Sequence, residues 1–111
     1  MKDNKLIAEF MGLPTEVFNS GNLNYYFKEF NSGAWYEEQE LSYNISWDWL
    51  MPVVEKIESL GYEFTIVENR CKVSNNTDHS VKELFHIETI GSKIETTYKA
   101  IVQFIKKNKT I

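Results

Sequence analysis

The chain has 111 residues, of which 42% are hydrophobic and 14% aromatic, and its formal net charge is −4. This size and composition suit one globular domain with a single core, so we expect residues 1–111 to form one domain and exclude a disordered chain. A single cysteine, Cys71, excludes an intrachain disulfide and a cysteine-based zinc site. The sequence has no signal-peptide pattern and no apolar run near the roughly 18 residues of a membrane span, so a cytoplasmic location is favoured.

The first expected element is a short amphipathic helix near the N-terminus. Asp3 or Asn4 can cap its start. Its apolar residues fall on one side: Leu6, Ile7, Phe10 and Met11. Gly12 suits a left-handed stop and Pro14 forbids continuation, so the pattern predicts that the helix ends at Met11.

The segment from Thr15 to Asn44 has the least regular pattern. Its apolar residues from Leu23 to Phe30 have helical spacing, but the density of aromatic residues there also suits a strand. Periodicity does not decide between the two, and we favour a helix. Ser32-Gly33 is a turn signal, and the glutamate-rich stretch Ala34 to Tyr43 is expected to be an exposed edge strand or an acidic loop.

The run from Ser46 to Glu58 predicts the second helix. At 100° per residue, seven apolar side chains fall within an arc of about 160°. These residues are Trp47, Trp49, Leu50, Val53, Val54, Ile57 and Leu60. The two tryptophans lie at opposite borders of this arc, which is typical of residues that cover a core. If Ser46 caps the helix, Pro52 lies beyond the first four residues and should kink the helix near its start. If Asp48 caps it, Pro52 is one of the first four residues, whose N–H groups have no partner within the helix, so its missing N–H costs little. Gly61 is expected to end it.

The last part of the chain predicts a hairpin, a strand and a helix. Tyr62 to Val67 and Arg70 to Ser74 are β-rich and flank Glu68-Asn69, which predicts a hairpin. A polar loop, Asn75 to Ser80, is expected to lead to a third strand within Leu84 to Ile90.

The third helix has the clearest signals. Ser92 and Glu95 form a capping-box pattern, and apolar residues then recur at helical spacing as far as about Asn108. The elements together predict an α+β fold, in which a small antiparallel sheet of three or four strands is flanked by helices in a two-layer or sandwich-like arrangement.

The sequence predicts no catalytic residue, no cofactor and no metal site. Neither His79 nor His86 has a nucleophile or a second ligand at motif spacing, so both are interpreted as structural. Cys71 is expected to be a small buried hydrophobic residue. Every glycine is isolated, which argues against a phosphate-binding loop. We therefore expect a protein that is not an enzyme.

An acidic and aromatic cluster is the predicted partner-binding site. Carboxylates can steer a protein toward a basic surface, and aromatic side chains can anchor it there. The predicted residues are Tyr25, Tyr26, Trp35, Tyr36, Glu37, Glu38 and Glu40. The alternative is that these aromatic residues belong to the core.

Lysines near the C-terminus suggest a second possibility. Lys106, Lys107 and Lys109 can contact phosphates of DNA or RNA. Cations are also expected at a helix C-terminus because of the helix dipole, and the sequence pI of about 5.2 argues against nucleic-acid binding.

Three blocks of the sequence resemble small uncharacterised proteins of Bacteroidetes phages and prophages, and more remotely the phage ABA sandwich domain. The blocks are Ile7 to Gly12, Ser46 to Glu58 and Ser92 to Lys106. The resemblance implies a phage origin and the cytoplasm of a bacterial host, and it implies no catalytic residue. With the acidic composition, it favours a non-enzymatic inhibitor of a bacterial defence nuclease, similar to an anti-CRISPR protein, that binds a basic nuclease effector. The alternatives are a nucleic-acid-binding accessory protein and a small structural or assembly protein that forms a homodimer.

Overall fold

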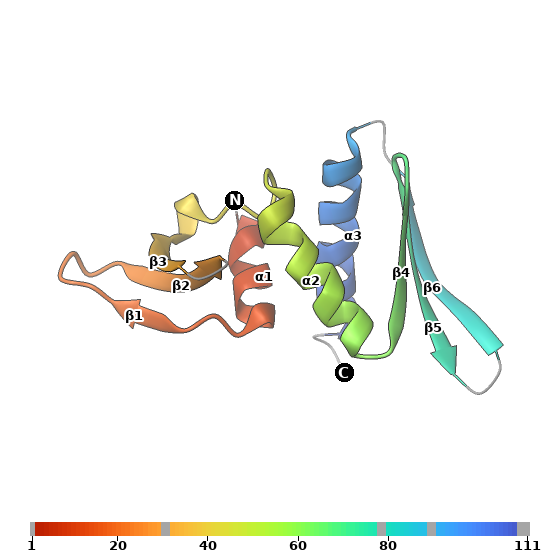
Figure 1. The fold of residues 1–111 in the computed structure, drawn as a ribbon, viewed down its shortest axis with the longest axis horizontal. Coiled ribbons are helices and arrows are strands. Elements are labelled where there is room, and N and C mark those ends of the chain that lie inside the picture. Colours follow the sequence, from red (N-terminus) through yellow and green to blue (C-terminus); the bar gives the residue numbers. More distant parts are fainter. Residues whose placement is uncertain (1, 30–31, 78–79, 89–90, 109–111) are drawn as a thin grey trace.

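The computed structural model describes residues 2–29, 32–77, 80–88 and 91–108, and it has an α+β fold (Figure 1). The helices described are α1 (Lys2–Met11), α2 (Trp47–Ser59), α3 (Lys93–Asn108) and a 3-10 turn, η1 (Glu38–Glu40). One antiparallel sheet has the strands β1 (Thr15–Val17), β2 (Leu23–Glu29) and β3 (Ser32–Glu37). The other has β4 (Tyr62–Val67), β5 (Arg70–Thr77) and β6 (Ser80–Glu88).

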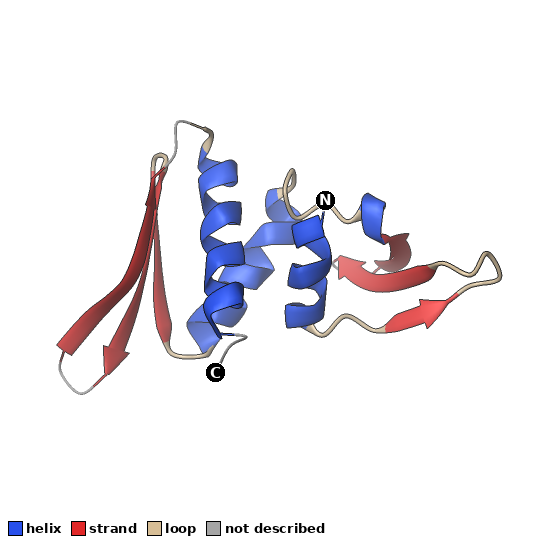
Figure 2. Ribbon diagram, turned by 180° about the vertical axis from the view of Figure 1, so that it is seen from behind, coloured by secondary structure: helices blue, strands red, loops and turns tan. Residues whose placement is uncertain are grey.

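The three α-helices lie between the two sheets, which occupy opposite ends of an elongated molecule (Figures 1 and 2). The α+β class is therefore confirmed. The arrangement differs in detail from the expectation, because the described chain has two sheets that flank the helices and not one sheet flanked by them.

Helix α1 ends at Met11, as predicted, and Gly12 follows with a φ of 68°. The prediction that Asp3 or Asn4 caps the helix is wrong, because both residues lie inside it. The Asn4 side chain is buried and bonds across the fold: its Nδ2 donates to the Leu41 carbonyl oxygen and to Asn44 Oδ1, each at 2.9 Å.

Helix α2 begins at Trp47, with Ser46 as its N-cap residue and Pro52 inside the helix. The Ser46 carbonyl accepts bonds from the N–H groups of Trp49 and Leu50. Of the two expected starts, the structure shows the one at Ser46. The helix buries its apolar side through Trp49, Leu50, Val53, Val54 and Ile57. Trp47, at one border of the predicted arc, and Leu60, directly after the last residue of the helix, stay exposed.

The prediction of a helix from Leu23 to Phe30 is wrong. Leu23–Glu29 is strand β2, the central strand of its sheet, and Phe30 lies outside the described residues. The strand form satisfies the backbone on both sides, because β2 bonds to β1 and to β3. It also separates Tyr25 and Phe27, which are buried, from Tyr26, which points to the other face. Strand β3 lies at the sheet edge, so the edge-strand alternative is confirmed for residues 34–37, whereas Glu38–Glu40 form the 3-10 turn η1. The expected turn at Ser32-Gly33 is wrong, because both residues belong to β3 and pair with β2.

The predicted hairpin and third strand form the β4–β5–β6 meander. Glu68 occupies the turn with a φ of 53°. The predicted polar loop from Asn75 to Ser80 is wrong at both ends, since β5 continues to Thr77 and β6 starts at Ser80; residues 78 and 79 lie outside the described residues. Helix α3 packs on this sheet, and the Ser92 hydroxyl accepts a bond from the Glu95 N–H at 3.3 Å, as the capping pattern predicts.

Candidate protein-binding surface

Three aromatic rings meet on the outer face of the β1–β2–β3 sheet. The strand register places Tyr26 opposite Trp35, and their ring centroids lie 5.2 Å apart. Phe18, directly after β1, packs against Trp35 with centroids 5.5 Å apart at an interplanar angle of 62°. Phe18 is 40% exposed and Trp35 is 36% exposed. We call Phe18, Tyr26 and Trp35 the aromatic cluster.

Backbone features hold Tyr26 in this cluster. The Tyr26 N–H donates to the Pro14 carbonyl oxygen at 2.8 Å, which ties β2 to the segment before β1. The Tyr26 hydroxyl lies over Gly33, in the space where a β-carbon at that position would stand. A side chain at position 33 would therefore have to displace the Tyr26 ring.

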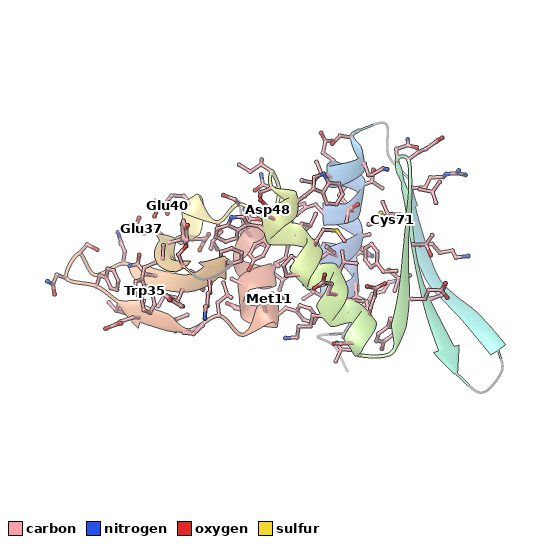
Figure 3. All side chains as sticks on the ribbon, in the orientation of Figure 1. Met11, Trp35, Glu37, Glu40, Asp48 and Cys71 are labelled. Carbon is pink, nitrogen blue, oxygen red and sulfur yellow. The ribbon has the colours of Figure 1, made fainter. Side chains whose placement is uncertain are left out.

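Two carboxylates share the outer face with the aromatic cluster. Glu16 of β1 and Glu37 of β3 are both paired with Asn24, so they stand on the same face at the two edges of the sheet. Glu37 follows Trp35 by two residues, which places both on that face. Figure 3 shows Trp35, Glu37 and Glu40 together at the end of the molecule remote from Cys71.

The acidic segment after β3 is held in a fixed shape. The Glu37 N–H donates to Glu40 Oε1 at 2.9 Å, and the Glu37 side chain accepts a bond from the Glu40 N–H in return. Glu37 also accepts bonds from Asn22 Nδ2 at 3.2 Å and from Gln39 Nε2 at 2.5 Å. These bonds hold the Glu37 and Glu40 side chains in one orientation.

The structure separates the seven predicted residues into groups. Tyr26, Trp35 and Glu37 lie on the outer face, and Glu38 and Glu40 lie on η1. Tyr25 and Tyr36 are paired with each other on the inner face.

The inner-face pair packs toward the helices. Tyr25 is buried, and Tyr36 packs edge-to-face on Trp49 with ring centroids 5.0 Å apart. Burial, together with the charges of Glu9 and Glu38, raises the pKa of Tyr25. Tyr25 and Tyr36 therefore belong with the core, as the alternative interpretation of the aromatic residues predicted.

An apolar groove of about 720 Å³ adjoins the aromatic cluster. It lies between the end of α1 with the turn after it, strand β2, and the first half of α2. Its apolar lining includes Met11, Leu13, Tyr26, Trp47, Met51 and Pro52. Three charged residues also line it: Lys28, Asp48 and Glu55. Tyr26 belongs to both the groove and the aromatic cluster, so the two surfaces are continuous.

The apolar groove is absent from the sequence-based prediction. Trp47 and Met51 are four residues apart on α2 and 36% and 37% exposed, which marks a second apolar stripe beside the buried one. That stripe is the one signal the sequence carries. The opposite wall comes from the turn after α1 and from β2, and the sequence does not place these beside α2.

Potential metal ligands do not cluster in the described part of the chain, and the Cys71 thiol is buried. The described residues contain no group of three or more histidine, cysteine, aspartate or glutamate residues that could hold a metal ion. Cys71 is buried, as predicted, and burial raises the pKa of its thiol, although a contact with the Thr97 hydroxyl at 3.4 Å lowers it. His79 and the His86 side chain lie outside the described residues.

The C-terminal lysines are partly engaged within the fold. Lys106 Nζ lies 3.7 Å from Asp3 Oδ1 of α1. Lys109 lies outside the described residues. Among the helices that the structure describes, none is long and apolar enough to cross a lipid bilayer.

Comparison with known proteins gave no match to a protein-family model, to a curated protein or to a solved structure. The resemblance to phage and prophage proteins therefore stays a prediction.

Proposed function

We propose that this chain is a non-enzymatic binding protein that covers a basic surface of another protein with the outer face of the β1–β2–β3 sheet. The observation that carries this proposal is the exposed aromatic cluster on the same face as Glu16 and Glu37. Tyrosine and tryptophan are the residues most enriched among the energetic centres of protein interfaces, and acidic groups around them favour a basic partner.

The geometry suits binding because the anchors are already ordered. Trp35 is held between Phe18 and Tyr26, so little side-chain freedom is lost when a partner covers it. The bonds within the η1 segment orient Glu37 and Glu40 in the same way. Between Leu13 and Asn44 the sequence has five glutamates and a single lysine, which supports attraction to a positively charged protein surface.

A nuclease effector of a bacterial defence system is the most concrete partner of this kind. Its nucleic-acid channel must be basic to hold phosphates. A small acidic protein that occupies this channel would inhibit the nuclease, as an anti-CRISPR protein does. The resemblance of three sequence blocks to phage proteins supports this version of the proposal.

The alternatives have less support. Direct nucleic-acid binding would use the C-terminal lysines, and Lys106 is already close to Asp3. A homodimer through the aromatic cluster remains a distinct outcome of the experiment below, because it would appear as self-association without a foreign partner.

The proposal is tested by affinity capture from a bacterial host that carries defence nucleases. We expect the wild-type chain to retain a basic protein, and a variant with Trp35→Ala and Glu37→Lys to lose it. Reversal of Glu37, Glu38 and Glu40 to lysine tests the acidic contribution alone. The matched control is Val67→Ala with Glu63→Lys on β4, which changes an exposed apolar residue and an exposed carboxylate at the other end of the molecule. Equal capture by the wild type and the Trp35 variant would disprove the proposed contact.

A further inference from the structure

The apolar groove has walls of different chemistry. Its α2 wall places Trp47 and Met51 beside two carboxylates, Asp48 and Glu55. These carboxylates are seven residues apart, which is about 10.5 Å along the helix axis. The β2 wall contributes Tyr26 and the cation Lys28, and the turn after α1 adds apolar side chains.

We infer that this groove binds an arginine-bearing apolar segment of the partner protein. Apolar side chains of the segment fill the space beside Met51, while arginine guanidinium groups pair with Asp48 and Glu55. Trp47 and Tyr26 can add cation–π contacts, for which tryptophan is the best aromatic partner. The inference rests on the proposed function, since the occupant is part of the partner that covers the aromatic cluster.

Charge complementarity favours a basic segment over a purely apolar one. Within the described part of the chain, Lys28, Asp48 and Glu55 take part in no ion pair with one another, and Asp48 and Glu55 are exposed. An apolar occupant would lower the dielectric around both carboxylates without giving them a partner, which is costly. Arginine satisfies them with a planar, bidentate group. Lys28 on the opposite wall then faces a backbone carbonyl or an acidic side chain of the segment, which fixes its direction.

The size of the groove favours a segment over a folded domain. A volume of about 720 Å³ lies within the range of sites that enclose small ligands, roughly 300–1,000 Å³. Continuity through Tyr26 lets one partner cover Trp35 and insert this segment at the same time.

The test uses the whole chain labelled with ¹⁵N and a capped hexapeptide of alternating leucine and arginine, followed by NMR titration at low salt. We expect the Trp47 indole N–H and the backbone signals around Met51 to shift with peptide concentration. A citrulline peptide of the same length, which keeps the shape and removes the charge, should bind about tenfold more weakly. The double variant Asp48→Asn with Glu55→Gln should bind the arginine peptide more weakly by a similar factor, since each exposed ion pair contributes about two- to fivefold to the affinity.

The matched control is Glu58→Gln, an exposed carboxylate of the same helix that does not line the groove; its affinity should equal that of the wild type. Equal affinity for the arginine and citrulline peptides, or shifts that avoid Trp47 and Met51, would overturn the inference. These outcomes are separate from the proposed function, because loss of partner capture in the Trp35 variant does not depend on peptide binding in the groove.

Discussion

Phe27 and Trp49 stack face to face, with ring centroids 3.7 Å apart and planes within 5° of each other. Phe27 belongs to β2 and Trp49 to α2, so this stack joins the first sheet to the helices. Tyr36 and Tyr43 pack edge-on against Trp49, with ring centroids at 5.0 and 5.2 Å. The outer face of the sheet therefore depends on an aromatic core on its inner face.

We expect Trp49→Ala to lower the free energy of unfolding by about 3–5 kcal/mol, because it removes a buried ring against which Phe27, Tyr36 and Tyr43 all pack. Urea denaturation followed by circular dichroism measures this. Trp47→Ala is the matched control: Trp47 is 36% exposed, and its removal should cost less than about 1 kcal/mol. Equal losses in both variants would contradict the role of the stack.

A buried polar network connects α1, α3 and the segment before α2. Asn4 bonds to Leu41 and Asn44, and the Tyr98 hydroxyl donates to Asn4 Oδ1 at 2.9 Å. We expect Asn4→Ala to destabilise the fold by about 3 kcal/mol, because it leaves the buried Tyr98 hydroxyl and Leu41 carbonyl without this partner.

Tyr98→Phe should cost less, about 1 kcal/mol, because it removes one bond of the network. The two changes share a hydrogen bond, so a double-mutant cycle should show that they are not additive. Strict additivity would show that the Asn4–Tyr98 bond contributes nothing to stability.

Tyr43 is fully buried among aromatic rings, and its hydroxyl has no hydrogen-bond partner among the described residues. We expect Tyr43→Phe to raise the free energy of unfolding by about 1 kcal/mol, since it removes the desolvation cost of an unpaired hydroxyl and leaves the ring packing intact. A lower unfolding midpoint in urea would contradict this and would indicate that the hydroxyl is hydrated.

The same variant should change the stability at high pH. Burial raises the pKa of Tyr43, and burial with the charge of Asp3 raises the pKa of Tyr98 to about 12. Because a tyrosine in the unfolded chain has a pKa of about 10, the unfolded state loses these protons first, and stability should fall as the pH rises from about 10 to 12. Tyr43→Phe should make this fall shallower.

Gly33 provides a test of the aromatic cluster without removal of any ring. A β-carbon at this position would displace the Tyr26 hydroxyl. We expect Gly33→Ala to move Tyr26 away from Trp35, reduce the near-ultraviolet circular dichroism of the cluster and weaken partner capture, with a change in stability below about 1 kcal/mol. In a Tyr26→Ala background the same substitution should have no effect. If Gly33→Ala weakened capture further in the Tyr26→Ala protein, Gly33 would act through something other than Tyr26.

The sequence predicts those elements whose signals are local. Gly12 and Gly61 follow the ends of two helices as expected, and the Ser92 to Glu95 pattern marks the start of α3. These features depend on the backbone of a few neighbouring residues, so a single sequence is sufficient to find them. The β4–β5 hairpin is predicted for the same reason.

Features that depend on distant residues are not predictable in this way. The Leu23 to Phe30 pattern fits a helix and a strand equally, and pairing with β1 and β3 decides for the strand. Asn4 has the chemistry of a cap but is used as a buried link to residues about 40 and 94 positions away. The candidate site shows the same division: the predicted Trp35 and Glu37 lie together, whereas the groove beside them needs the tertiary arrangement of α2.

The affinity of Trp35→Ala for the captured partner tests the central claim most directly. Trp35 lies at the middle of the aromatic cluster, so isothermal titration should show at least about tenfold weaker binding, as for a central interface residue, with an unfolding midpoint close to that of the wild type. We also expect wild-type binding to weaken steeply as the salt concentration rises, because the proposed partner surface is basic and would lie against Glu16 and Glu37. Unchanged affinity in a folded Trp35→Ala protein would contradict the assignment of this face as the binding surface.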